Sequence, residues 1–185
     1  MGETGAPVRR IVSRLPEFCG RPIRIDVRPA LLICGGRLVH SGSRGAPVHA
    51  ASDIRGRRIL LEEELYGRAG ELARVLTHEL FHFVWARMSN ACRWSYEAVL
   101  EREIRLGGKG ELGWPAEEKK QRLQRRDAEG RTRRWRDYVC ESFCDTAAWY
   151  FTGSSDGETL LKPRFRAWRA DWFRNFAPAG RRIPI

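Results

Sequence analysis

The stretch "VLTHELFHFVWARM", residues 75–88, contains no glycine or proline and carries two histidines four residues apart. Apolar residues recur through it at helical spacing, which predicts a helix over residues 70–88. Residues i and i+4 lie on one face of a helix, so His78 and His82 project together. Their ring nitrogens can then reach a single cation about 2 Å from each.

Strands are predicted before this helix. Residues 23–27 alternate apolar and charged side chains, which is the period of a strand with one buried face. Residues 30–36 predict a second strand, and residues 57–65 predict a strand that leads into the helix. Between them, residues 37–56 mix strand-like fragments with Gly, Ser and Pro and indicate a loose hairpin or a long loop.

Helices are predicted after it, each with start or stop signals such as Pro115 in a first turn or Gly153 after a last one. They cover residues 95–106, 114–130, 132–151 and 162–176. Strands followed by helices indicate an α+β fold, in which helices pack against one side of a small mixed sheet. A chain of 185 residues with 42% apolar residues suits one domain over residues 1–185.

The composition also bears on where the protein works. The first residues lack the apolar stretch of a signal peptide, and no run of eighteen apolar residues occurs, so membrane insertion is not predicted. The five cysteines are an odd number and form no C-x-x-C pair, which argues against a disulfide framework. A cytoplasmic location is therefore expected.

The histidine pair suggests a catalytic metal site. Glu79, beside the first histidine, is placed to hold a metal-bound water and take its proton without being a ligand itself. Catalytic zinc takes three protein ligands and leaves one position for water, so a third ligand is needed. The other histidines, His40 and His49, both precede the pair, which excludes sites that need a further histidine downstream.

The third ligand should then be a carboxylate. Glu141 is the best candidate, because it lies mid-helix among aromatic residues, where an unpaired carboxylate is costly to bury. Glu97 and Glu101 are competitors, although their neighbours indicate an ordinary solvated helix face. Thiolate ligation by Cys140 or Cys144 stays open, but a free cysteine is usually a small buried apolar residue.

Asp145 follows Glu141 by four residues, where it can accept a hydrogen bond from the outer nitrogen of a ligating histidine. Together, H-E-x-x-H at residues 78–82 and E-x-x-x-D at residues 141–145 resemble the gluzincin zinc metallopeptidases. The resemblance implies a zincin-like fold in which His78, His82 and Glu141 bind Zn²⁺ and Glu79 is the general base. It also implies that Asp145 orients a histidine, expected to be His78, and that the substrate is a peptide or protein.

The resemblance covers less than half of the chain. Residues 92–131 are expected to be an insertion between the two ligand-bearing helices. Tyr150 and Tyr138 are candidates to stabilise the oxyanion, because any donor aimed at the developing charge can serve. The strand over residues 57–65 is expected to be the sheet edge that receives an extended substrate.

The net charge of +11 allows an alternative function. Residues 119–136 are rich in Lys and Arg, and the last predicted helix adds further arginines. Such a surface can bind nucleic acid or another polyanion, or it can be merely solvated. The alternative to a peptidase is therefore a catalytically silent zincin-like protein that binds a polyanion through its Arg-rich surface.

Overall fold

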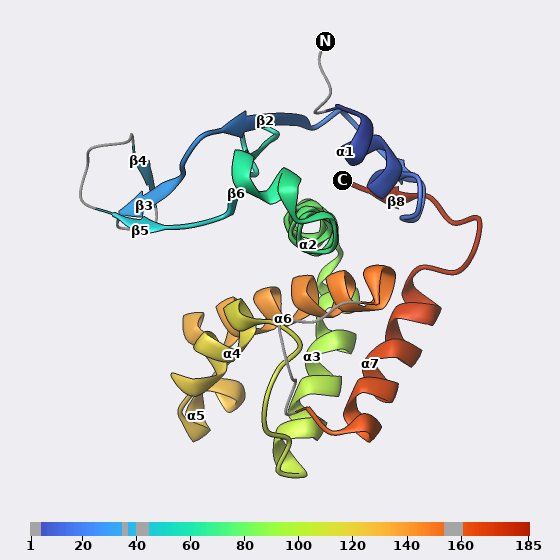
Figure 1. The fold of residues 1–185 in the computed structure, drawn as a ribbon. Coiled ribbons are helices and arrows are strands. Elements are labelled where there is room, and N and C mark those ends of the chain that lie inside the picture. Colours follow the sequence, from blue (N-terminus) through green and yellow to red (C-terminus); the bar gives the residue numbers. More distant parts are fainter. Residues whose placement is uncertain (1–4, 35–36, 40–44, 154–160) are drawn as a thin grey trace.

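The computed structural model describes residues 5–34, 37–39, 45–153 and 161–185. The helix predicted around the histidines spans Ala69–Arg87 (α2). Figure 1 looks along its axis and shows strands on one side of it and the long helix α6 (Arg133–Thr152) crossing on the other. Apolar side chains of α2 are buried against both layers. A helix that is apolar on two sides is stable only between two layers, so α2 is the middle of the fold.

The main sheet has three strands in the order β2-β7-β6, with bounds Arg24–Arg28 (β2), Arg58–Glu62 (β7) and Ala50–Asp53 (β6). β7 pairs in parallel with β2 and antiparallel with β6, so the sheet is mixed. Ile59 and Leu61 of β7 are fully buried in the cluster that includes Leu72 and Leu76 of α2. The predicted α+β class is confirmed at this level of description.

The prediction that residues 57–65 form an edge strand is wrong. β7 is the central strand, with a neighbour on each side, and β6 is an edge of this sheet. β6 comes from the segment that sequence reasoning assigned to a loose hairpin or loop. Ala50, Ala51 and Ser52 are small and do not alternate in polarity, so β6 is specified by its backbone pairing to β7 and gives no period-two signal.

Smaller elements complete the strand layer. The segment 30–36 supplies a strand, as predicted, which pairs with two short neighbours in the order β4-β3-β5. A parallel pair, β1 with β8, brings the end of the chain beside its first part (Figure 1). These elements are α1 (Gly5–Val12), β1 (Phe18–Cys19), β3 (Leu32–Cys34), β4 (Arg37–Val39), β5 (Ala46–Pro47), η1 (Glu63–Gly67) and β8 (Ile183–Pro184).

The remaining helices gather around α6, on the side away from the sheet (Figure 1). They are α3 (Asn90–Arg105), α4 (Trp114–Gln121), α5 (Arg125–Glu129) and α7 (Pro163–Phe176). The single helix predicted over residues 114–130 is two helices. The Asp127 carboxylate accepts a hydrogen bond of 2.7 Å from the backbone N–H of Gln124, and this capping box begins a new helix after the end of α4.

The segment 92–131, expected to be an insertion, is built into the helical layer. Most of α3 and all of α4 and α5 come from it, and buried residues of α3 join those of α6 and α7. Tyr96 and Leu100 of α3 pack with Phe143 of α6 and Phe173 of α7 in one core. Within the described ranges, no helix combines the length and apolar character needed to cross a membrane.

Candidate metal centre

The two histidines of α2 face α6, where Glu141 lies near the middle of the helix. His78 Nε2 and His82 Nε2 are 3.1 Å apart. Glu141 Oε2 lies 3.3 Å from His78 Nε2 and 3.7 Å from His82 Nε2. The structure therefore brings together three atoms that can bind a metal ion, from segments about sixty residues apart in the sequence.

The outer nitrogen of each ring also has a partner. His78 Nδ1 lies 2.8 Å from Asp145 Oδ1, and both side chains are buried. His82 Nδ1 lies 3.6 Å from the sulfur of Cys140. In the neutral imidazole only one nitrogen carries hydrogen, so an Nδ1–H donated to these acceptors leaves the lone pair on Nε2.

Three lone pairs therefore converge on one point between α2 and α6. A proton can bridge only one pair of these atoms, whereas one metal ion can accept all three. For ligands about 2.0–2.1 Å from a tetrahedral zinc, neighbouring ligand atoms lie about 3.3 Å apart. The three separations of 3.1, 3.3 and 3.7 Å are close to that value. The donor set, two imidazoles and one carboxylate, is one that zinc accepts at catalytic sites.

The carboxylates dominate the electrostatics of the pair. Burial lowers the pKa of His78, but Asp145 first, then Glu141, outweigh it and hold that pKa well above its ordinary value. Burial likewise lowers the pKa of His82, while the hydrogen bond with Cys140 and the charge of Glu141 raise it to about 9. Burial raises the pKa of Glu141, yet the two histidines bring it to about 2. The arrangement thus favours a positive charge between the two ring nitrogens and the carboxylate oxygen.

Cys144 offers a second possible third ligand. Its sulfur and a ring nitrogen of each histidine all lie within 4.8 Å of one another. Metal ligation needs the thiolate, but burial raises the pKa of Cys144 well above its ordinary value. Glu141 has the lowered pKa of an ionised carboxylate and lies 3.3 and 3.7 Å from the two ring nitrogens, so Glu141 is the stronger candidate for the third position and Cys144 is its competitor.

Glu79 lies on the neighbouring edge of the histidine face and is 9% exposed. Its Oε2 is 2.5 Å from the hydroxyl oxygen of Ser52, which is also 3.0 Å from the Glu79 carbonyl oxygen. Ser52 belongs to β6, so the edge strand of the main sheet runs beside this carboxylate. A hydroxyl that donates to one carboxylate oxygen holds Glu79 in a fixed orientation next to the histidines.

The competing carboxylates are used elsewhere. Glu97 accepts hydrogen bonds from Arg131 at 2.8 Å and from the Trp135 indole at 3.4 Å. Glu101 lines a cleft of about 910 Å³ that is bounded by α3, α4 and α5. The structure does not bring either of them to the histidine pair.

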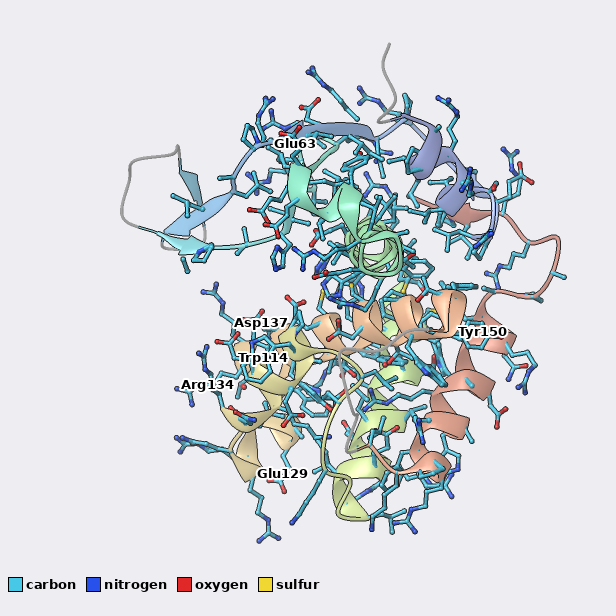
Figure 2. All side chains as sticks on the ribbon, in the orientation of Figure 1. Glu63, Trp114, Glu129, Arg134, Asp137 and Tyr150 are labelled. Carbon is cyan, nitrogen blue, oxygen red and sulfur yellow. The ribbon has the colours of Figure 1, made fainter. Side chains whose placement is uncertain are left out.

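The two tyrosines expected to stabilise an oxyanion are not gathered at the histidines either. Tyr138 is fully buried, and its hydroxyl donates to Glu111 Oε1 at 2.6 Å. Tyr150 packs on Phe151 and Phe173 in the aromatic core, and Figure 2 shows it toward the α7 end of α6, away from Trp114 on α4. Residue type alone made the two tyrosines candidates, and in the structure both side chains have other neighbours.

Sequence reasoning missed three contacts of this centre: Ser52 with Glu79, Cys140 with His82, and the start of α4 with Asp145. The Ala116 N–H donates to Asp145 Oδ2 at 3.0 Å. No motif signals these contacts, because each joins residues at least 27 positions apart through the fold. Of the remaining histidines, His49 pairs with Glu62 at 2.7 Å and His40 lies outside the described residues.

Comparison with known proteins adds no relative: no family model, curated protein or solved structure matches the chain. The function is therefore inferred from the geometry of the centre.

Proposed function

We propose that this protein is a zinc-dependent metallopeptidase of the gluzincin type. His78, His82 and Glu141 would hold the zinc, Glu79 would be the general base, and Asp145 would orient His78. The observation that carries the proposal is the convergence of the three ligand atoms at 3.1–3.7 Å, with the Glu79 carboxylate on the same helix beside them.

Bound zinc would supply a water whose pKa is lowered to roughly 7 and a positive charge that polarises a carbonyl group. Glu79 would take a proton from the water that attacks the peptide carbonyl and return it to the amine nitrogen released when the C–N bond breaks. Ser52 keeps the Glu79 carboxylate in place during both transfers. Asp145 accepts the Nδ1–H of His78, which keeps the other ring nitrogen free as a ligand.

β6 would receive the substrate in place of β7. It is an edge of the main sheet, and its Ser52 contacts Glu79. An extended peptide can add to such an edge through backbone hydrogen bonds, which recognise a chain without selecting its side chains. A peptide or protein substrate is therefore the class that this site favours, and a cytoplasmic location stays a prediction.

The polyanion-binding alternative has weaker support. Several of the basic side chains in residues 119–136 are committed to acidic partners, which reduces the charge they offer to a ligand. These pairs are Lys120–Glu111, Arg122–Glu118, Arg131–Glu97 and Arg133–Asp137. No described contact favours this reading over the peptidase, and the experiment below separates the two.

The test is Glu79→Gln, assayed for cleavage of a mixed peptide library and for bound zinc. We expect cleavage to fall about 10²–10⁴-fold, because the general base is lost, while zinc stays bound. Glu71→Gln is the matched control, since Glu71 lies on the same helix and pairs at 2.6 Å with Arg68 near the start of α2. Undiminished cleavage by Glu79→Gln would contradict the proposal. A zinc-loaded wild type that cleaves no peptide but binds nucleic acid in a salt-sensitive way would favour the alternative.

A further inference from the structure

The carboxylate of Asp145 is held from two sides. Oδ1 faces His78 Nδ1 at 2.8 Å, and Oδ2 accepts the backbone N–H of Ala116 at 3.0 Å. Ala116 is in the first turn of α4, where backbone N–H groups have no partner within the helix. A backbone amide can only donate, so it fixes the orientation of Asp145 and leaves Oδ1 to accept from the histidine.

Gly113, which precedes α4, makes this approach possible. A Cβ atom at Gly113 would lie 2.3–2.6 Å from the carboxylate atoms of Asp145, closer than non-bonded atoms approach. The backbone of Gly113 is extended, with φ −153°, so glycine is needed for space and not for an unusual dihedral angle. Any larger residue must push Asp145 away from its place beside His78.

The segment that carries Gly113 is anchored on its far side. Glu111 is buried and accepts hydrogen bonds from Arg169 of α7 and Tyr138 of α6. Leu112 is buried in a small cluster with Phe165. The buried contacts of Glu111 and Leu112 therefore fix the position of Gly113. Gly113 in turn packs directly against the carboxylate of Asp145.

We propose that residues 111–116 are part of the metal centre and fix the orientation and hydrogen-bonding state of His78 through Asp145. Gly113 and Ala116 are positioning residues in this arrangement. The segment 92–131 then has a role at the metal centre, because α4 from that segment supplies the backbone N–H that holds Asp145. It rests on the proposed zinc site for its functional meaning, but the positioning of His78 can be measured without metal.

The experiment measures zinc affinity, by competition with a chromophoric chelator, in a double-mutant cycle of Gly113→Ala and Asp145→Ala. We expect Gly113→Ala to weaken zinc binding about 10–100-fold, the usual effect of losing an outer partner of a ligand. In the Asp145→Ala background the same change should have little further effect. Gly70→Ala is the matched control, because a Cβ there meets nothing within 4 Å.

A second measurement uses the downfield proton resonance expected for a His78 Nδ1–H bonded to a carboxylate, recorded on metal-free protein and assigned by its loss in Asp145→Ala. The resonance should persist in Gly70→Ala and disappear in Gly113→Ala. If Gly113→Ala does not fold, Ala116→Pro removes the N–H that donates to Asp145 Oδ2, at a first-turn position where no hydrogen bond within the helix is lost.

These outcomes separate two failures. A wild type that binds no zinc but loses the His78 resonance on Gly113→Ala would overturn the zinc site and keep the positioning of His78. An unchanged resonance in a folded Gly113→Ala or Ala116→Pro protein would overturn the positioning. Equal losses of zinc affinity with and without Asp145 would also overturn it, because Gly113 would then act by another route.

Discussion

Two polar clusters share helix α6, one fully buried and the other partly exposed at His82 and Glu141, and they differ in how their charges are satisfied. The metal cluster consists of His78, His82, Glu141 and Asp145. The arginine cluster consists of Arg169, Glu103, Glu111 and Tyr138. Both are enclosed by helices, so polar groups in both need partners to offset the cost of burial.

The arginine cluster contains its own cation. Arg169 is fully buried and donates to both carboxylates, at 2.6 Å to Glu103 Oε2 and 2.6 Å to Glu111 Oε2. Lys120 adds a second positive charge 3.0 Å from Glu111. Two acids therefore meet two bases, and the cluster is complete as a structural feature that joins α3, α6 and α7.

Among the described residues, no lysine or arginine contacts the acids of the metal cluster, so a positive charge between them comes from protonated histidines or from a bound cation. Glu141 and Asp145 make their contacts there with the histidines and with the Ala116 amide. Two ring nitrogens and a carboxylate oxygen face one another instead. The comparison teaches that an arginine neutralises the acids of one cluster, whereas in the other two ring nitrogens and the Glu141 carboxylate converge as they would around a cation from outside the chain.

The largest effect should come from removing the cation of the arginine cluster. Arg169→Met leaves two buried carboxylates without their partner, and we expect the free energy of unfolding to fall by about 3–5 kcal/mol. Urea denaturation of metal-free protein measures it. Arg174→Met is the control, because Arg174 pairs with Asp171 at the surface and its loss should cost less than about 1 kcal/mol. Equal, small losses in both variants would show that the arginine cluster is not self-sufficient.

The free energy of unfolding that the arginine cluster loses in acid should be somewhat smaller than the loss in Arg169→Met. Burial raises the pKa of Glu111, but Arg169 and Lys120 bring it down to about 2. A lowered pKa means that Glu111 stabilises the fold fully above its ordinary pKa and loses that contribution as the pH falls toward 2.

The free energy of unfolding of wild type and of Glu111→Gln is measured by denaturation at several pH values from 6 to 2, with a chelator present to keep the protein free of metal. We expect a difference in unfolding free energy of roughly 3 kcal/mol at pH 6 that shrinks as the pH falls. The pKa of Glu103 is raised, so Glu103 favours the folded state as the pH falls and offsets part of this loss. Glu118→Gln, at an exposed pair with Arg122, serves as control. A difference independent of pH would contradict the assignment.

The smallest effect should come from the outer partner of His82. Cys140 lies 3.6 Å from His82 Nδ1, a weaker contact than the 2.8 Å between His78 and Asp145. We therefore expect Cys140→Ala to reduce zinc affinity about tenfold or less, with partial recovery in Cys140→Ser, which keeps an acceptor. Cys92→Ala is the control, and chelator competition is the measurement. A loss larger than that of Asp145→Ala would reverse the ranking of the two histidines.

Sequence reasoning could single out the four side chains that gather between α2 and α6 because they belong to two helices with fixed internal spacing. An i, i+4 pair shares a face on any helix, so His78 with His82 and Glu141 with Asp145 follow from the letters alone. That the two faces meet depends on the packing of α2 against α6, which the spacing does not contain.

The same reasoning failed for features that depend on backbone pairing or on contacts between segments distant in the sequence. β6 has small side chains and no alternation, so its pairing to β7 could not be read from the sequence. Gly113 is one of eighteen glycines, and only the packed structure shows that Asp145 occupies the place of its missing side chain. Tyr138 was assigned to the site by residue type, but the buried Glu111 that engages it is 27 residues away.

The most direct test of the zinc site is the metal content of untagged protein, purified without added metal and then measured again after zinc is supplied. Wild type, Glu141→Ala and Cys144→Ala should be compared, since these variants separate the assigned third ligand from its competitor. We predict about one zinc per chain in wild type and in Cys144→Ala, and a large loss in Glu141→Ala. A wild type that takes up no zinc, or a loss in Cys144→Ala but not in Glu141→Ala, would contradict the account.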